Sequence, residues 1–530
     1  MAPAAVAQPA EPIEIREVQG LILRGYGDLE GARYFALRIG AGANGAARAR
    51  AWLAEIAPEV TSAAAVTDRH LNIAFTYLGL ERLGLPAHAL AGFPTAFAEG
   101  AAGIAPDGKS ASHRSVALGD VGKSAPEKWR FGNAAQPIDI ALFLFTRSAG
   151  AIDGFASEHA ERLADHELEV VGGDSFPVLA LPGRKEHFGF RDGIGQPALR
   201  NSNPPDERPG ALEVDRPENT VEPGEFLFGY RNHYGAVATA ATVQPESDPH
   251  EILDPGPDWY GVALRDFSRN GSLLVWRQLE EHVKEFWDAI ASHSEDDPGA
   301  RRKLAAKFFG RWPSGAPLVL APDLDPELDP AVDHSNPEAT LADANDFSFA
   351  KHDPYGFHVP FGAHIRRGNP RDWFLSPTPE QSLIVASAHR IIRRGRPYGP
   401  PVADSMHPED ILAAPVDERE RGVHFLCFMA DIERQFEMIQ STWLNDAKFG
   451  GLYDEVDPML GAPSAGGGSF TIQATPVRRK ITGLPRFATV RGAAYLFMPS
   501  LKAVRFLSTL GATAVTAADH AAASRSRASD

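Results

Sequence analysis

The order of apolar segments in the first third of the chain limits its fold more strongly than any other feature. Runs rich in β-forming residues alternate with segments of helical periodicity in the order strand, helix, strand, strand, helix, strand. The predicted strands are Gln19–Arg24, Arg33–Ile39, His70–Thr76, Ile138–Thr146 and Leu168–Val171, and the predicted helices are Ala46–Ile56, Leu78–Leu83 and Ala151–Ala164. This order is the split βαβ, or ferredoxin-like, pattern.

A similar order returns in the second half of the chain, with long insertions between its elements. The predicted strands there are Ser272–Val275, Gly422–Met429 and Ala493–Met498, and the predicted helices are Arg277–Ile290, Ile432–Trp443 and Leu501–Leu510. A chain of 530 residues is also too long for one ordinary hydrophobic core. We therefore predict an α+β protein made of two ferredoxin-like halves with antiparallel sheets.

Shifts in composition suggest where these halves begin and end. We expect a flexible tail at 1–14, an N-terminal domain at 15–200, a connection rich in Pro, Asn and Asp at 201–224, a C-terminal domain at 225–512 and a disordered tail at 513–530. The last tail is biased towards Ala, Ser and Arg.

Charge and cysteine content exclude several classes of function. The net charge of −17 repels nucleic acid and anionic membranes rather than attracting them. The single cysteine, Cys427, excludes an intrachain disulfide, a cysteine-rich zinc site and a protein-bound iron–sulfur cluster. The N-terminal stretch has no basic segment followed by a long apolar core, and no run approaches the roughly 20 apolar residues of a membrane span. We expect no membrane partner and a cytoplasmic location.

The stretch Asp353–Asp372 places one histidine, His364, between a turn-prone run and a basic run. A lone imidazole held in such a segment can serve as an axial ligand of haem iron. His358 lies six positions earlier, which does not suit two ligands on one helical face. The alternative is an ordinary surface or core histidine.

The sequence GFRDG at Gly189–Gly193 contains a second candidate, Asp192. Gly193 can adopt positive φ, so the loop could direct the carboxylate of Asp192 into a pocket as an acid–base group. The alternative is a surface turn with Asp in its favoured position.

A cluster of arginines is unusual in so acidic a protein. The cluster consists of Arg390, Arg393, Arg394 and Arg396. One guanidinium buried in a pocket would stabilise developing negative charge. We expect most of the four to be solvated, as in an ordinary basic loop.

Two acidic clusters offer hard oxygen ligands of the kind that Ca²⁺ or Mn²⁺ prefers. One is Pro322–His334, and the other contains Asp454, Glu455 and Asp457. The first lacks the spacing of an EF-hand loop, so solvated acidic turns are the alternative for both.

Three of these stretches, taken together, resemble the dye-decolourising peroxidases. GFRDG matches the GxxDG motif of that family, FGAHIRRGNPRD matches its proximal-histidine segment, and HRIIRRGRPYGP is similar to its distal-arginine segment. The similarity extends from about Glu14 to about Leu510, and the insertions are similar to those of the long branch of the family.

The resemblance implies roles for individual residues. His364 would be the proximal ligand of haem iron, Asp192 the distal acid–base residue, and Arg393 the distal arginine, which also contacts the cofactor. Arg393 is preferred among the four arginines because it is the fourth residue after His389 in the matched segment. Val359 stands where many relatives have a cysteine.

The family also implies a carboxylate behind the proximal histidine. Asp454, Glu455 and Asp457 remain alternatives for it. One haem b per chain would be held without a covalent bond, mainly by the C-terminal half, since no CxxCH sequence is present. The GxxDG loop would reach the distal face of the haem from the N-terminal domain.

The implied activity is that of a haem peroxidase. Such an enzyme reduces hydrogen peroxide and oxidises bulky aromatic donors such as dyes and phenols through a ferryl intermediate, with Mn²⁺ left open as a further donor. Surface relays for these donors would be tryptophans or tyrosines, and the candidates are Trp259, Tyr260, Trp373 and Trp443. A homo-oligomer is also left open.

Other functions would fit part of the same pattern. They are a haem carrier or storage protein, an iron-releasing haem-processing enzyme, and a metal-free α+β binding protein. The joint presence of Asp192 and Arg393 favours catalysis, because a carrier needs neither residue.

Overall fold

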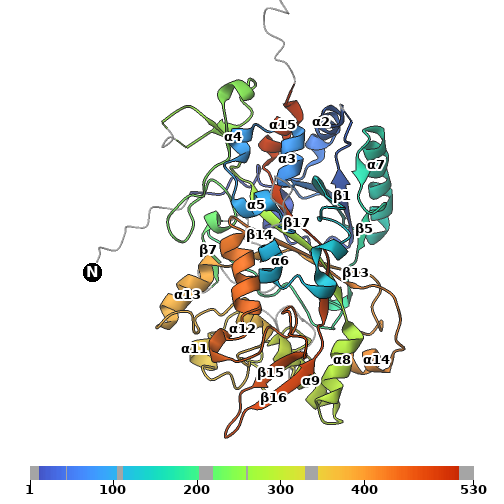
Figure 1. Cartoon of the computed structure of the whole chain (residues 1–530), viewed down its shortest axis with the longest axis vertical. Helices are drawn as coiled ribbons and strands as arrows, with labels where there is room; N and C mark the ends of the chain where they lie inside the picture. Colours follow the sequence, from blue (N-terminus) through green and yellow to red (C-terminus); the bar gives the residue numbers. More distant parts are fainter. Residues whose placement is uncertain are drawn as a thin grey trace, which may run out of the picture.

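The computed structural model describes residues 11–42, 44–103, 112–201, 219–257, 261–328 and 344–511 (Figure 1). A ten-stranded sheet runs through both halves in the order β12-β14-β11-β17-β2-β3-β1-β4, with β13 paired to β14 and β5 paired to β1. Its strands are β1 (Gly31–Arg38), β2 (Arg69–Phe75), β3 (Ile140–Thr146), β4 (Glu169–Val170), β5 (Phe176–Val178), β11 (Ser272–Glu281), β12 (Ile392–Arg393), β13 (Arg396–Tyr398), β14 (Gly422–Met429) and β17 (Ala488–Met498).

Helices pack around this sheet, and the remaining short strands form separate small sheets. The helices are α1 (Gly20–Leu23), α2 (Gly45–Ile56), α3 (Tyr77–Leu83), α4 (Ala87–Leu90), α5 (Thr95–Glu99), α6 (Ser112–Leu118), α7 (Ile152–Asp165), α8 (Val283–Ser292), α9 (Pro298–Phe309), α11 (Phe349–His352), α12 (His364–Gly368), α13 (Pro379–Ala388), α14 (Pro408–Ala413) and α15 (Leu501–Thr509). The remaining strands are β6 (Ala198–Leu199), β7 (Thr220–Val221), β8 (Thr242–Val243), β9 (Asp254–Pro255), β10 (Arg265–Asp266), β15 (Gly468–Ile472) and β16 (Arg479–Leu484).

Each half of the sheet has the strand order that the sequence pattern predicts. In the first half β1 lies between β3 and β4, and β2 lies beyond β3, all antiparallel. In the second half β11 lies between β14 and β17, and β12 and β13 lie beyond β14. The predicted fold class, α+β with two ferredoxin-like halves, is confirmed. The halves meet where Phe497 of β17 pairs with Phe75 of β2, so one sheet continues across them.

Strand alternation separates two hydrophobic cores. Phe35 and Leu37 of β1 face the core that contains α2 and α7, whereas Tyr34 and Ala36 of the same strand face the opposite core. Because both faces are covered, β3 is buried at every position, as a strand inside a layered fold should be. The sheet is therefore a rigid support for the loops at its ends.

The predicted strand Gln19–Arg24 is wrong, because Gly20–Leu23 forms the short helix α1. The segment lies against β2 instead of joining the sheet. The N–H of Leu21 donates to Oδ1 of Asn72 at 2.9 Å. The side-chain Nε2 of Gln19 donates to the carbonyl oxygens of Ile73 and Pro499 at 2.9 and 2.8 Å. These contacts hold the segment outside the sheet.

Two predicted helices also differ from the structure. Residues 277–281 belong to β11 rather than to the predicted helix Arg277–Ile290, and α8 begins only at Val283. The reason is tertiary, because β11 has a pairing partner on each side along its length. The segment predicted as Ile432–Trp443 is helical but forms π-type turns at Glu433–Glu437 and Ile439–Leu444.

The predicted domain boundaries stay predictions. Residues 1–10, 202–218 and 512–530 of the expected tails and connection lie outside the described residues. Within the expected N-terminal tail, Ile13 is buried and Glu14 pairs with Arg269 at 2.8 Å. Among the described residues, no helix is both long and apolar enough to cross a membrane.

Candidate active site

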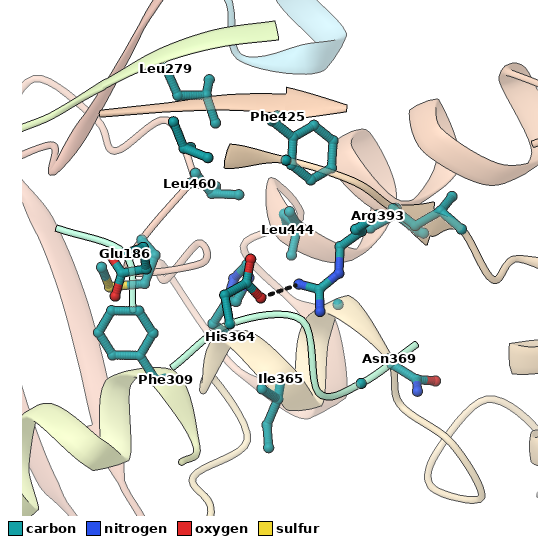
Figure 2. A pocket seen from close by; sticks show the side chains of 18 of the residues that line it. Glu186, Leu279, Phe309, His364, Ile365, Asn369, Arg393, Phe425, Leu444 and Leu460 are labelled. Carbon is teal, nitrogen blue, oxygen red and sulfur yellow. Dashed lines mark ion pairs between the residues drawn. The ribbon is translucent and has the colours of Figure 1, made fainter. Parts of the chain in front are cut away.

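A cavity of about 270 Å³ lies where strands β11, β12 and β14 meet helices α9 and α12 and the loop at residues 186–195. Figure 2 shows His364 and Arg393 entering it from α12 and β12. Much of its wall is apolar, and these side chains include Leu279, Phe309, Phe425, Leu444, Leu460 and Val490. The cavity therefore suits a large apolar ligand with a few polar attachment points.

His364 is the first residue of α12 and lines the cavity. Its Nδ1 lies 3.0 Å from Oδ2 of Asp457, whose side chain is completely buried. Oδ1 of Asp457 accepts hydrogen bonds from the N–H groups of Met459 and Leu460, at 2.9 and 2.7 Å. The carboxylate is thus fixed, and it favours the tautomer with hydrogen on Nδ1. Nε2 remains as the ligand atom, in the arrangement typical of metal-binding histidines.

Electrostatics keep this carboxylate ionised. Burial alone would raise the pKa of Asp457, but the charge and hydrogen bond of His364 and the N–H of Leu460 bring it below its ordinary value. Of the three sequence candidates for the proximal carboxylate, Asp457 is therefore the one that contacts His364. It lies 93 residues further along the chain.

The short helix α12 is anchored by the basic run that follows His364. Arg366 is buried and pairs with Asp353 at 2.8 Å. Arg367 is also buried, and it donates to the carbonyl oxygens of Trp443 and Glu455 at 2.7 and 2.6 Å. These two anchors fix the histidine's backbone even though the helix has only five residues.

Asp192 enters the cavity from the loop that precedes β6. Gly193 adopts φ +84°, which a residue with a side chain rarely does. Oδ1 of Asp192 lies 3.3 Å from Nη1 of Arg393. The Asp192 side chain is enclosed by the protein, yet 49% of its surface remains exposed because it faces the cavity.

The charge state of Asp192 follows from its neighbours. Burial would raise its pKa, but the charge of Arg393 and the N–H of Gly193 bring it below the ordinary value. Asp192 is therefore a carboxylate near neutral pH and can accept a proton. The structure brings all three predicted site residues to one cavity, namely His364, Asp192 and Arg393.

The expectation that most arginines of the 390–396 cluster are solvated is wrong. Arg390, Arg394 and Arg396 are all buried. Arg394 donates to the carbonyl oxygens of Leu21 and Ile22, at 3.0 and 2.9 Å. Arg396 likewise donates to backbone carbonyl oxygens. A guanidinium of this cluster can therefore be buried where peptide oxygens accept its hydrogen bonds. Arg393 differs because it pairs with a carboxylate in the cavity.

Further arginines line the cavity, among them Arg311, which sequence reasoning missed, and Arg390 of the predicted cluster. Arg311 donates to the carbonyl oxygens of Gly315 and Ala344, at 2.9 and 2.7 Å. Arg390 donates to a side-chain amide oxygen of Asn219 at 3.0 Å. Within the described parts of the chain, neither guanidinium forms an ion pair with a carboxylate.

Arg371 and Arg393 place further positive charge near Arg311 and Arg390. Burial and the charges of Arg371 and Arg393 lower the pKa of Arg311 to about 9 and that of Arg390 to about 9. A buried cation without an anion is costly. One side of the cavity is therefore suited to an anionic group of the ligand. No local sequence signal identifies Arg311, which lies outside all three motifs.

Most of the remaining candidates do not line this cavity. In the described residues, no group of three or more His, Cys, Asp and Glu side chains could hold a metal ion. Residues 329–334 of the acidic stretch lie outside those residues, as do Trp259 and Tyr260. Trp443 lines the cavity, whereas Trp373 packs beside Arg366. His358 does not line it, and Val359 is buried.

Comparisons with known proteins agree on one family, although no family model matches the chain. The chain is 32% identical over 353 residues to a dye-decolorizing peroxidase of Mycena epipterygia, covering 61% of this chain and 58% of that relative. It spans less than two thirds of the Mycena relative's length. It is 27% identical over 521 residues to the multifunctional dye peroxidase DyP2 of Amycolatopsis sp. (strain ATCC 39116 / 75iv2), covering 93% of each chain.

Solved structures give the same result. The crystal structure of a fungal DyP-type peroxidase from Auricularia auricula-judae matches with a TM-score of 0.70 and 26% identity. The match covers 94% of this chain and 100% of that one. Both halves of the sheet and the cavity elements between them therefore lie within the matched architecture.

Proposed function

The chain belongs to the dye-decolorizing peroxidase family, and we propose that it is a haem peroxidase that reduces hydrogen peroxide and oxidises aromatic donors. One observation carries the proposal. A single apolar cavity has a histidine–carboxylate pair, His364–Asp457, and a carboxylate–guanidinium pair, Asp192–Arg393. The first pair is suited to hold a metal, and the second is suited to move a proton beside negative charge.

The residues present fit a haem. His364 offers Nε2 as an iron ligand, and the apolar walls suit the face of a macrocycle. Arg311 and Arg390 supply buried positive charge for two propionates. We propose haem b, held without a covalent bond, because the chain has no CxxCH sequence. When bound, the haem supplies an iron that binds peroxide and accepts electrons one at a time from donors.

The proximal residues hold and orient the cofactor. The fixed carboxylate of Asp457 keeps hydrogen on Nδ1 of His364, which raises the basicity of Nε2. Arg366 and Arg367 fix the backbone of α12, and this holds the imidazole of His364 in one position beside the haem site.

The distal residues handle the proton of hydrogen peroxide. Asp192 begins as a carboxylate, takes a proton from one peroxide oxygen and returns it to the oxygen that leaves as water. Arg393 stabilises the negative charge that develops while the O–O bond breaks. Its ion pair with Asp192 also keeps the base ionised before peroxide arrives.

Catalysis is favoured over haem carriage by this distal pair. A carrier or storage protein needs His364 but has no use for a carboxylate and a guanidinium set 3.3 Å apart across the cavity. The same pair is the reason to prefer peroxide reduction over a metal-free binding role.

Absorption spectroscopy of the purified protein tests the proposal. We expect a Soret band that shifts when hydrogen peroxide is added and returns when 2,6-dimethoxyphenol is added. Acid–butanone extraction should remove the colour. A colourless protein that gains no Soret band when incubated with haemin would contradict the proposal, and colour that stays with the chain would contradict non-covalent binding.

A further inference from the structure

A second cavity, of about 180 Å³, adjoins the first. Asp192 and Arg393 line both cavities and so form part of the wall between them. The second cavity is bounded by the segments 25–29, 179–196 and 393–397. It gives a route to the distal pair that does not pass the proximal histidine.

The lining of this second cavity is strongly basic in a chain whose net charge is −17. Its six basic side chains are Arg184, Lys185, Arg191, Arg393, Arg394 and Arg396, and its two acidic ones are Glu186 and Asp192. Asp192 is already paired with Arg393. Burial raises the pKa of Glu186 to about 8, so this acid does not offset the positive charge near neutral pH.

Arg184 and Lys185 are the cations whose charge is available to a ligand. Among the described residues, neither side chain has an ion-pair partner within 4.0 Å. The guanidinium of Arg184 lies over the backbone of Gly27, since a Cβ built on that glycine would be 3.5 Å from Cζ and 3.6 Å from each Nη. The guanidinium that borders the cavity is therefore in van der Waals range of position 27.

The loop that carries Asp192 also fixes these two cations. The N–H of Asp192 donates to the carbonyl oxygen of Arg184 at 3.2 Å, and Lys185 forms an antiparallel bridge with Arg191. Arg184 adopts φ +56°, a left-handed backbone conformation that residues with a side chain rarely adopt. The position of the rim charge is thus coupled to the position of the distal carboxylate.

Apart from Gln196 and glycines, the rest of the lining is aliphatic. It includes Leu29, Leu179, Leu181, Ile194, Pro397 and Val423. A flat ring would contact these side chains while an attached anion met the rim cations. Charge at the rim and apolar surface within together describe a small aromatic anion rather than an inorganic one.

We propose that the second cavity is a subsite for small aromatic anions, carboxylates or sulfonates with a phenolic hydroxyl, which Arg184 and Lys185 select as electron donors. The inference rests on the proposed peroxidase function. In the overall reaction one peroxide and two phenols give two waters and two phenoxyl radicals. Each phenol loses one electron and one proton, and the peroxide gains the two electrons and two protons.

Binding without turnover is the first test. Calorimetric titration of the haem-loaded protein with 4-hydroxybenzenesulfonate, in the absence of peroxide, should give a Kd that rises about tenfold in the double variant Arg184→Gln/Lys185→Gln. The matched control is Lys128→Gln/Arg478→Gln, which removes two exposed charges outside both cavities. Equal loss in both double variants, or none in the first, overturns the subsite. Sodium sulfate that competes as strongly as the sulfonate overturns the aromatic part.

Donor preference is the second test. The ratio of kcat/KM for 4-hydroxybenzoate to that for its neutral methyl ester should fall about tenfold in Arg184→Gln/Lys185→Gln and stay constant in the control. An unchanged ratio overturns the proposal. Thermal unfolding of each variant shows whether the fold is intact. A wild-type protein that binds the sulfonate but does not react with peroxide would contradict the peroxidase function alone.

Discussion

Two aspartates serve the same cavity from opposite environments. Asp457 is completely buried, and it is held by a histidine and two backbone N–H groups. Asp192 is 49% exposed, is followed directly by the left-handed Gly193 and pairs with Arg393. Both have a pKa below the ordinary value. The difference shows that fixing a carboxylate and freeing it to exchange protons require different surroundings, even when the charge state is the same.

The largest effect should come from removing the residue that Asp457 orients. We expect His364→Ala to lose almost all haem after purification, because the one protein–iron bond is gone, while thermal unfolding of the apoprotein stays close to that of the wild-type apoprotein. Haem content is measured by pyridine haemochrome absorbance. His358→Ala is the matched control and should keep its haem. Full haem in His364→Ala would show that the ligand lies elsewhere.

Asp192→Asn should slow the reaction with peroxide by about 10²–10⁴-fold, since the amide cannot accept a proton. The sign of the pH dependence follows from the lowered pKa of Asp192. The wild-type rate should persist in mildly acid solution and fall as pH falls through that pKa, whereas the variant should lose this acid limb. Stopped-flow measurement of the Soret change against pH provides the check. An unchanged rate and limb would remove Asp192 from the chemistry.

Arg393→Leu should slow the same step by about 10²–10³-fold, because charge developing on peroxide is no longer stabilised. It should also raise the pKa of Asp192 and move the acid limb to higher pH, since burial then acts without the opposing cation. Arg394→Leu is a contrasting variant from the same cluster. It should lower thermal stability instead, because the carbonyl oxygens of Leu21 and Ile22 lose their donor. Similar kinetic losses in both variants would contradict this division.

Asp457→Asn should weaken haem affinity by about 10–100-fold without removing the ligand. The amide cannot hold hydrogen on Nδ1 as a carboxylate does. The transfer rate of haem to apomyoglobin measures the effect. Asp454→Asn, in the same acidic cluster, serves as the control, because the side chain of Asp454 does not contact His364. A loss as large in Asp454→Asn would contradict the assignment of Asp457.

The smallest effect concerns two cavity carboxyls without ion-pair partners among the described residues, Glu186 and Glu281. Burial raises the pKa of Glu186 to about 8, and burial together with Glu186 raises that of Glu281. The folded state then binds more protons than the unfolded state, so stability should fall as pH rises from about 4.5 towards about 8.

Glu281→Gln should flatten this dependence, because the amide cannot titrate and the contribution of the raised pKa of Glu281 is removed. Urea unfolding of the haem-loaded protein at pH 5 and pH 8 measures the change. Glu285→Gln, on the neighbouring helix α8 and outside the cavity, is the control. A pH dependence in Glu281→Gln equal to that of the wild type would contradict the prediction.

Local sequence patterns were enough to predict the order of most helices and strands and the main candidate residues of the site. Asp192 could be found because a glycine that takes positive φ follows it directly, and the proximal segment around His364 is likewise contiguous. The apolar pattern of β3 and β14 also predicted both strands closely, since burial on both faces leaves a long hydrophobic run.

The hydrogen-bond and ion-pair partners of these residues could be identified only in the folded structure. The sequence left three candidates for the carboxylate behind His364. The fold brings Asp457, 93 residues further along the chain, into contact with that histidine. The sequence does not distinguish the arginines beside Arg393 from solvated ones. In the structure Arg394 and Arg396 are buried, and they donate hydrogen bonds to backbone carbonyl oxygens in and after α1. Gln19–Arg24 has the composition of a strand, but contacts with β2 and with Pro499 hold Gly20–Leu23 as a short helix outside the sheet. The local pattern of apolar and polar residues predicts whether a side chain is buried or exposed. Its hydrogen-bond and ion-pair partners depend on contacts between segments that are distant in the sequence.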